Sequence, residues 1–389
     1  MKAHGAASRR VVVVGGGIAG LSAAVRLSQA GLAVTLLEAS QLGGAASTRN
    51  QGWLHSGGLF AHEAPDYARD CYAALQQTIE FCPDCLEPGI SPMAYLFSRP
   101  DTLVRSWTHA WHAAGIPQNE MPLDDVFAAL PGIDRARIQH AFKLPDRSIR
   151  LEVLLAQLAA TAQNAGVEIR TGTPVNHLVR HGNRIDGVAT AAGEEIAARL
   201  VILAGGTTGN ALTAEYRQEQ AGSQPDVELV PLKAHLVGIQ PAVGWLPFCI
   251  PDAEGLSHLP HLPASVFGTN RWEKVLQPDD NVDPRQVDLL RKRVHDFFPA
   301  LKPEAGGIAW AGTMIQPLQV DQVETGGAIW PAVIDHIRYA PHIENLLSIY
   351  SGRATLWSRL AEETRRAALA RLDTAPVGTA HPPWAESQE

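Results

Sequence analysis

Residues 10–38 read Arg10-Val-Val-Val-Val-Gly-Gly-Gly-Ile-Ala-Gly-Leu-Ser-Ala-Ala-Val-Arg-Leu-Ser-Gln-Ala-Gly-Leu-Ala-Val-Thr-Leu-Leu-Glu38, and this stretch decides the fold. Its β-branched run, Val11 to Val14, predicts a short parallel strand that is buried on both faces. Gly15, Gly17 and Gly20 follow in G-x-G-x-x-G spacing. The first glycine allows a tight turn, the second lets the backbone approach a pyrophosphate, and the third lets the helix pack closely on the strand.

The remainder of the stretch completes a strand, helix and strand unit. Apolar residues continue at helical spacing to Gly31, and Val34 to Leu37 predict a second strand. Backbone N–H groups at the helix start, at Ile18 and Ala19, would face the phosphates. Glu38, which is followed by Ala39, ends the second strand. Its carboxylate can accept hydrogen bonds there from both ribose hydroxyls of the nucleotide. The unit predicts a site for FAD or NAD rather than an ordinary glycine-rich turn.

Composition places the chain among ordinary globular proteins and excludes several partners. Its 389 residues are 46% hydrophobic and 19% charged, with a net charge of -8, so we expect two domains and no nucleic-acid surface. No apolar run approaches the roughly 20 residues of a membrane helix, so no transmembrane segment is expected. The first ten residues also lack the apolar centre of a secretory signal. These features predict a cytoplasmic protein.

The cysteines and histidines predict neither a disulfide framework nor a metal site. The chain has four cysteines, and Cys82-Pro-Asp-Cys85 has the C-x-x-C spacing of redox and zinc sites without a second ligand pair. A turn at a helix end with two thiols is the simpler interpretation. His258 and His261 lie among prolines, and no further ligands accompany them.

A second segment carries a family resemblance. Residues 47–58 read Ser47-Thr-Arg-Asn-Gln-Gly-Trp-Leu-His-Ser-Gly-Gly58. Together with the first glycine turn, this run resembles the FAD-dependent oxidoreductases of the D-amino-acid-oxidase superfamily. It is most similar to the L-2-hydroxyglutarate oxidase and glycerol-3-phosphate dehydrogenase branches. The resemblance implies FAD as the cofactor.

The same resemblance assigns roles within this segment. It implies that Ser47, Thr48 and Arg49 face the phosphates, and that three further residues lie near the flavin: Asn50, Gly52 and His55. From the residues alone, Arg49 could be a surface cation and His55 a hydrogen-bonded core histidine. A covalent link from His55 to the flavin is a further alternative, because some amine-oxidising relatives attach FAD through a histidine in a similar segment.

Two later segments resemble the family's return to the nucleotide site. Leu200-Val-Ile-Leu-Ala-Gly-Gly-Thr-Thr-Gly209 predicts a buried strand and a second glycine turn, and the resemblance places Ala204 and Gly205 at that turn and Val175 on the adenine side. The closing run, 346–363, resembles the terminal Gly-Gly-Lys-x-Thr-Thr motif. Its implied cofactor-binding residues are Gly352, Arg353, Ala354 and Thr355. A helix start there would stabilise negative charge on the flavin N1–O2 edge.

The intervening segments predict a substrate domain that departs from the family. Residues 228–240 alternate as a sheet strand should, and place Lys233 and His235 on one face. Lys233 and Arg271 are the expected substrate-binding cations, and His235 is the reserve general base. Where the family has an arginine that meets a carboxylate, this chain has Gln316-Pro317. The chain also has Asn270-Arg271 where the glycerol-3-phosphate enzymes of the family have a Gly-Thr-Thr-Asp turn, so the resemblance does not extend to phosphate recognition.

The predicted fold class is α/β, with an α+β substrate part. The resemblance implies a Rossmann-like FAD/NAD(P)-binding domain of the glutathione-reductase type, built from residues 8–60, 145–215 and 340–373, with an antiparallel-sheet substrate domain from residues 61–144 and 216–339. Residues 374–389 should form a disordered tail.

The predicted reaction is hydride transfer from a substrate C–H to flavin N5. The favoured substrate is a hydroxy acid or polyol phosphate, with catalytic residues His55, His235 and Arg353. His55 would be the general base, since alcohol oxidation must release the hydroxyl proton. A D-amino acid, glycine or sarcosine type of amine is the alternative substrate, and a non-catalytic FAD-binding module is an alternative of another class. The electron acceptor would be oxygen, a quinone or another molecule.

Overall fold

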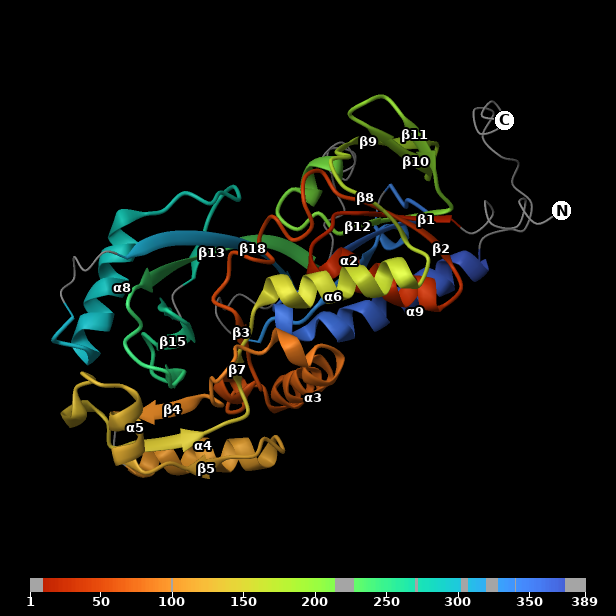
Figure 1. Cartoon of the computed structure of the whole chain (residues 1–389). Coiled ribbons are helices and arrows are strands. Elements are labelled where there is room, and N and C mark those ends of the chain that lie inside the picture. Colours follow the sequence, from red (N-terminus) through yellow and green to blue (C-terminus); the bar gives the residue numbers. More distant parts are fainter. Residues whose placement is uncertain are drawn as a thin grey trace.

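The computed structural model describes residues 10–98, 101–213, 227–269, 272–301, 307–319, 328–339 and 341–374. Arg271 and the predicted tail from residue 375 lie outside this part. The described chain forms two lobes, one around a parallel sheet and one around an antiparallel sheet (Figure 1).

A six-stranded sheet forms the first lobe, in the order β19-β20-β12-β1-β2-β8. All neighbouring pairs are parallel except β19 with β20. Its members are β1 (Arg10–Val14), β2 (Ala33–Leu37), β8 (Glu168–Arg170), β12 (Leu200–Leu203), β19 (Ala332–Asp335) and β20 (Leu346–Tyr350). Segments far apart in the sequence thus build one sheet. Their side chains are mostly buried, which explains the continuous apolar runs.

Three helices pack beside this sheet. They are α2 (Ile18–Gln29), α6 (Leu151–Asn164) and α9 (Trp357–Thr374), and α2 lies against both of the others (Figure 1). An antiparallel three-stranded sheet extends the same lobe, and its strands are β9 (Val175–His181), β10 (Arg184–Thr190) and β11 (Glu195–Ala197).

A nine-stranded sheet forms the second lobe, in the order β17-β13-β16-β15-β14-β4-β6-β5, with β18 pairing β13. Its long antiparallel pair is β13 (Val227–Ile239) with β18 (Ile308–Gln319). The other strands are β4 (Ala94–Phe97), β5 (Asn119–Glu120), β6 (His140–Lys143), β14 (Phe248–Ile250), β15 (Leu256–His261), β16 (Ala264–Gly268) and β17 (Glu273–Lys274).

The remaining elements cover the second lobe and join it to the first. The helices are α3 (Pro65–Phe81), α4 (Asp101–Ala113), α5 (Leu123–Ala129) and α8 (Pro284–Phe297), and the short 3-10 helices are η1 (Gly58–Phe60), η2 (Pro83–Cys85), η3 (Arg135–Arg137), η4 (Gly209–Thr213), η5 (His336–Arg338) and η6 (Ala354–Leu356). A two-stranded sheet, β3 (Trp53–Leu54) with β7 (Arg147–Ser148), lies where the lobes meet (Figure 1).

The α/β class with an antiparallel second part is confirmed. The domain boundaries stay a prediction. Cys82 and Cys85 lie at the end of α3 and in η2, and both are buried free thiols, as the helix-end interpretation expects. Within the described chain no group of histidine, cysteine and acidic residues could hold a metal ion.

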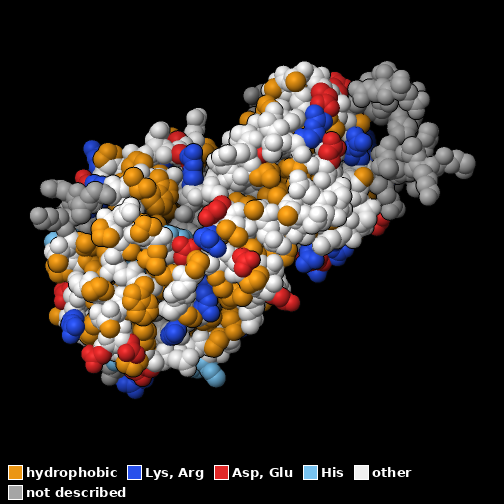
Figure 2. Space-filling view, viewed as in Figure 1, with side chains coloured by type: hydrophobic (Ala, Val, Ile, Leu, Met, Phe, Trp, Pro, Cys, Tyr) orange, Lys and Arg blue, Asp and Glu red, His pale blue; other side chains and the backbone are white. Residues whose placement is uncertain are grey.

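The surface carries charged side chains of both signs. On the face drawn in Figure 2, acidic and basic side chains are interspersed, without a large cluster of one sign. Among the helices that the structure describes, none combines the length and hydrophobicity needed to cross a bilayer.

His258 is part of the second lobe's core. It lies between Phe248 and Phe267, with ring centroids 5.2 and 5.0 Å away. Its Nδ1 donates to the Leu246 carbonyl at 3.0 Å, and its Nε2 accepts from the Ser265 hydroxyl at 2.7 Å. Both nitrogens are therefore used within the protein. Burial lowers the pKa of His258 from 6.5 to about 3.

Replacing His258 by glutamine should make folding less sensitive to acid. Between pH 6.5 and 3 the unfolded chain binds a proton at this histidine and the folded chain does not, so stability is lost as pH falls through that window. At 1.36 kcal/mol per pKa unit, the loss from pH 7 to pH 5 is about 2 kcal/mol. Urea unfolding at both pH values measures it. The difference should shrink by about that amount in His258→Gln but not in the exposed control His109→Gln, and equal differences in all three proteins would contradict the assignment.

Candidate active site

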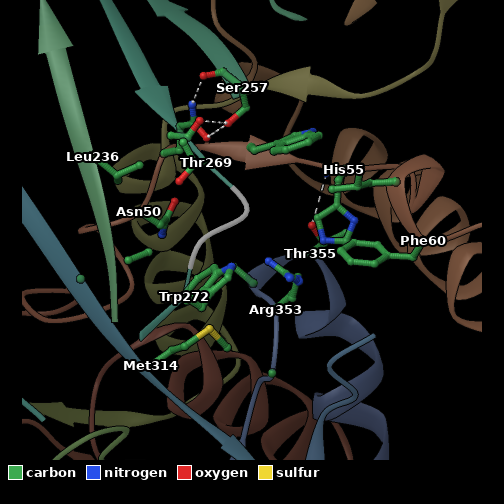
Figure 3. Close-up of a pocket in the computed structure, with 18 of the residues that line it drawn as sticks. Asn50, His55, Phe60, Leu236, Ser257, Thr269, Trp272, Met314, Arg353 and Thr355 are labelled. Atoms are coloured by element: carbon green, nitrogen blue, oxygen red, sulfur yellow. Dashed lines mark hydrogen bonds between the residues drawn. The ribbon is translucent and has the colours of Figure 1, made fainter. Parts of the chain in front are cut away.

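A cavity of about 640 Å³ lies between the second lobe's sheet and the chain that follows β1 and β20. Figure 3 shows Leu236, from β13, across this cavity from His55 and Phe60. The predicted site residues that line it are Ile18, Ser47, Arg49, Asn50, His55, Gly352, Arg353, Ala354 and Thr355. Residues from both ends of the chain thus meet here.

The first glycine turn has no room for side chains. A Cβ on Gly20 would overlap the carbonyl oxygen of Gly15, and one on Gly15 would lie 2.6 Å from the Ala204 oxygen. One on Gly17 would lie 2.9 Å from the hydroxyl of Ser47, which accepts a hydrogen bond from the Ile18 N–H at 3.0 Å. The start of α2 therefore faces a small, polar space, as anion binding requires.

The two glycine turns and the acid lie together. The Ala204 N–H donates to the Val14 carbonyl at 2.8 Å, which holds the end of β12 beside the end of β1. The Glu38 carboxylate accepts from the Gly16 N–H at 2.6 Å, and the Glu38 carbonyl accepts from Thr173, two residues before Val175. The structure thus brings four predicted parts of the nucleotide site to one end of the parallel sheet.

The segment from Ser47 to Gly52 is held by its own side chains. Asn50 donates to the Ser47 carbonyl at 2.8 Å and accepts from the Gly52 N–H at 2.8 Å. Gly52 has a φ of 71°, and a Cβ there would lie 2.6 Å from the Ile149 oxygen. Thr48 donates to the Gly43 carbonyl at 2.7 Å. These contacts fix the loop that leads from the nucleotide turn to His55.

Arg49 pairs with an acid from the other lobe. Its guanidinium contacts the Asp280 carboxylate, in the loop before α8, and its side chain is 42% exposed while lining the cavity. Arg49 is therefore partly exposed to solvent and paired with a carboxylate, whereas the sequence alone allowed a free surface cation.

His55 is a buried histidine without hydrogen bonds from its ring. Neither ring nitrogen has a partner in the described structure, although the side chain lines the cavity. Burial, and then the charge of Arg353, lower its pKa from 6.5 to about 3. Its ring packs against Phe60 and Tyr67, at centroid distances of 5.6 and 6.5 Å. The alternative of a hydrogen-bonded core histidine is therefore wrong, because neither ring nitrogen is hydrogen-bonded in the described structure.

Arg353 lies at the start of the closing helix pair, η6 and α9. Its guanidinium carbon is 4.9 Å from the Phe60 ring centroid and 5.4 Å from that of Trp272 (Figure 3). Its buried Nε has no hydrogen-bond partner in the described structure. Gly352, with a φ of 59°, precedes it, and a Cβ there would lie 2.6 Å from the Ile329 oxygen. Thr355 accepts a hydrogen bond from the His55 N–H at 3.4 Å, so this helix start contacts the histidine segment.

Lys233 and His235 share one face of β13, but that face is turned away from the cavity. The residues of β13 that line the cavity are Ala234 and Leu236, and side chains alternate along a strand. Lys233 pairs with Asp279, and the His235 Nε2 accepts from the Asp283 N–H at 3.0 Å. The structure therefore separates both from the other predicted site residues. Arg271 lies outside the described residues.

Sequence reasoning missed much of the cavity wall. Its unpredicted members include Trp53, Phe60, Trp107, Trp272 and Met314. Side-chain alternation along β18 could have placed Gly312 and Met314 on one face of that strand. It could not have shown which other strand this face lies against. Trp272 itself was not predicted, although the neighbouring Arg271 was an expected substrate-binding cation, because the direction of the indole depends on the fold of the second lobe.

These residues fit FAD. The glycine turns, the start of α2 and the Ser47 hydroxyl provide a cradle for a pyrophosphate, while the adjoining cavity has room for a ring beside unbonded nitrogens of His55 and Arg353. The fold and site thus define a dinucleotide-binding oxidoreductase of the flavoprotein class.

The chain belongs to the DAO family of FAD dependent oxidoreductases, whose model matches residues 10–366. It is therefore an FAD-dependent enzyme, and the NAD and non-catalytic alternatives are set aside. Glycine oxidase of Pseudomonas aeruginosa is 28% identical over 78% of this chain and 82% of its own length. One subunit of the anaerobic glycerol-3-phosphate dehydrogenase of Escherichia coli is 24% identical over 100% of this chain and 72% of its own length.

A solved structure agrees in fold. Glycine oxidase from Bacillus cereus superposes with a TM-score of 0.69 at 19% identity, covering 95% of this chain and 100% of that chain. These relatives act on amine and alcohol substrates by name, so they do not resolve the substrate of this chain.

Replacing Gly17 by valine should give a folded but colourless protein. The new side chain would fill the space between the start of α2 and the Ser47 hydroxyl, where the pyrophosphate must approach. The visible absorption spectrum measures bound FAD, and circular dichroism checks the fold. Gly31→Asn is the matched control, since Gly31 has a φ of +82° with open space around it and asparagine tolerates that conformation. Normal flavin content in folded Gly17→Val would contradict the assignment.

Proposed function

We propose that this enzyme oxidises the CH–OH group of a small hydroxy acid. FAD, when bound, accepts the hydride at N5, and the protein orients the substrate and holds its proton. The observation that carries the proposal is the imidazole of His55 in the cavity wall, whose two ring nitrogens have no hydrogen-bond partner in the described structure. The two-domain division and the cytoplasmic location belong to the same proposal, as does reoxidation by oxygen or a quinone.

His55 is the proposed proton acceptor. A pKa of about 3 leaves the imidazole uncharged at neutral pH, and neither nitrogen is occupied by another protein group. An alcohol hydroxyl that reaches this nitrogen can therefore pass its proton to the ring as the hydride leaves. The surrounding aromatic rings exclude water, which strengthens electrostatic interactions in the cavity.

The cavity charges favour a carboxylate over a phosphate. Arg49 already pairs with Asp280, whereas Arg353 has no carboxylate within ion-pair distance among the described residues. One unpaired cation suits a singly charged group better than a doubly charged phosphate. The resemblance gives no preference between the two groups, since the sequence departs from the family both at the phosphate-recognising turn and at the arginine that meets a carboxylate.

Amine oxidation is the second candidate, and two observations favour it. Glycine oxidase is among the relatives, and a histidine with a pKa of about 3 is a weak base. An amine can react as its own neutral form, so it needs no protein base. The two candidates differ in pH dependence between pH 5 and 8: hydroxy-acid oxidation should be flat, because His55 stays neutral, and amine oxidation should rise as the substrate loses its proton.

Replacing His55 by alanine tests the proposal. With a hydroxy acid that bleaches the wild-type flavin anaerobically, the reduction rate should fall by about 10²–10⁴-fold while FAD stays bound. Stopped-flow absorbance measures the rate. His62→Ala is the control, since His62 lies exposed at the same cavity. A His55→Ala rate within a few-fold of wild type would refute the base assignment and favour the amine.

Replacing Arg353 by methionine should slow flavin reduction and leave FAD bound. The guanidinium supplies positive charge beside the cavity, and losing one such contact costs about 2.7–4 kcal/mol at the transition state, or 10²–10³-fold. Arg366→Met, at an exposed position of α9, is the control for losing one arginine. Unchanged reduction kinetics in Arg353→Met would mean that Arg353 serves only to pack against Phe60 and Trp272.

A further inference from the structure

Behind the cavity wall lies a buried carboxylate that the proposed reaction does not use. Asp146 is fully buried immediately before β7. Its Oδ1 accepts from the indole N–H of Trp53 at 2.9 Å and from the Tyr95 hydroxyl at 3.2 Å, and its Oδ2 accepts from the Ser56 hydroxyl at 2.5 Å. Two other segments of the chain, residues 53–56 and β4, thus converge on this one side chain.

The partners of Asp146 suit its ionised form. An indole N–H can only donate, and the Ser56 oxygen already accepts from the Gly58 N–H at 3.2 Å, which leaves its own proton for Asp146. An ionised carboxylate accepts at both oxygens, as this arrangement needs. Burial raises the pKa of Asp146, and the hydrogen bonds from Ser56 and Trp53 oppose that rise.

The contrast with His55 makes this carboxylate significant. Because its ring nitrogens have no hydrogen-bond partner among the described residues, the imidazole is oriented there by its backbone and by the rings around it. One of those rings is Trp53, whose centroid is 6.3 Å away at an interplanar angle of 82°. Trp53 and His55 are two residues apart and both line the cavity, while Leu54 between them is buried in the core.

We propose that Asp146 is a positioning residue for the oxidation. It fixes the indole of Trp53 and the Ser56–Gly58 turn, and through both it sets where the imidazole of His55 lies in the cavity. The Trp111 indole strengthens the same turn, donating to the Gly58 carbonyl at 2.9 Å. The inference rests on the proposed function of His55, and it adds a residue that contacts neither substrate nor cofactor.

Asp146→Asn is the direct test. Asparagine has the same shape, but its amide accepts at only one of its two ends. Its NH₂ group would face either the Trp53 indole, which can only donate, or the Ser56 hydroxyl, which would then have to turn its proton away from residue 146. The holoenzyme should keep its FAD and lose about 10²-fold in flavin reduction rate at saturating substrate, as expected for a displaced reacting group. A rate within twofold of wild type would overturn the proposal.

A matched control and a second variant separate positioning from general damage. Asp335, which accepts from Arg371 Nε at 2.7 Å, does not line the cavity, so Asp335→Asn should lower the unfolding midpoint without slowing reduction. Trp53→Phe should slow reduction, and the double variant Trp53→Phe/Asp146→Asn should be slowed by less than the product of the two single effects, because Asp146 acts partly through Trp53. Independent, multiplicative effects of the two substitutions would overturn the proposal.

A spectroscopic measurement tests the role of Asp146 separately from the proposed function of the enzyme. The visible circular dichroism of bound FAD reports the groups around the flavin, and it should change in Asp146→Asn but not in Asp335→Asn. If no hydroxy acid or amino acid reduces even the wild-type flavin, the proposed function fails, and an unchanged dichroism would still overturn the role of Asp146. Should Asp146→Asn not fold, Tyr95→Phe removes a single donor. This substitution should change the visible dichroism of bound FAD by a smaller amount and with the same sign. An unchanged dichroism in Tyr95→Phe would contradict the proposed role of Asp146.

Discussion

The close contact of α2 with the ends of β1 and β12 is the constraint on which the rest of the structure depends. A Cβ at Gly20 would overlap the Gly15 carbonyl, and a Cβ at Gly15 would collide with Ala204. Only glycine lets the helix begin so close to the strand ends. The helix start consequently faces the point where the chain leaving β20 and the segment from Ser47 also arrive, and the cavity forms there.

The segment after Ser47 connects this point to the second lobe. The Gln51 side chain donates to the Ser257 and Val266 carbonyls at 3.2 and 3.0 Å, so it binds two strands of the antiparallel sheet. β18 crosses Arg49 so closely that a Cβ on Gly312 would lie 2.6 Å from the Arg49 oxygen. The cavity is therefore walled by both lobes, and its shape depends on their mutual packing.

The ionisable side chains at the rim of the cavity and those inside it have different partners. At the rim, Arg49 pairs with Asp280, and Asp252 accepts from Arg293 at 2.5 Å. Inside, Arg353 packs between aromatic rings and His55 is neutral. The Arg49–Asp280 pair is about half exposed, and solvated ion pairs of this kind are weak, whereas the Arg293–Asp252 pair is largely buried. Arg353 has no ion-pair partner among the described residues, and its guanidinium acts in the lower dielectric of the rings around it. This contrast supports the roles proposed for Arg353 and His55.

The sequence by itself determined the nucleotide-binding half. Residues 10–38 dictate a strand, a turn and a helix through local sterics, and the DAO resemblance joined them to Gly352 and Thr355 across most of the chain. The tertiary structure alone decided which charges enter the cavity. Alternation put Lys233 and His235 on one face of β13, but only the packing of that strand against α8 and β18 turned the face away. The support of Asp146 for Trp53 joins residues far apart in sequence, and no local pattern encodes such a contact.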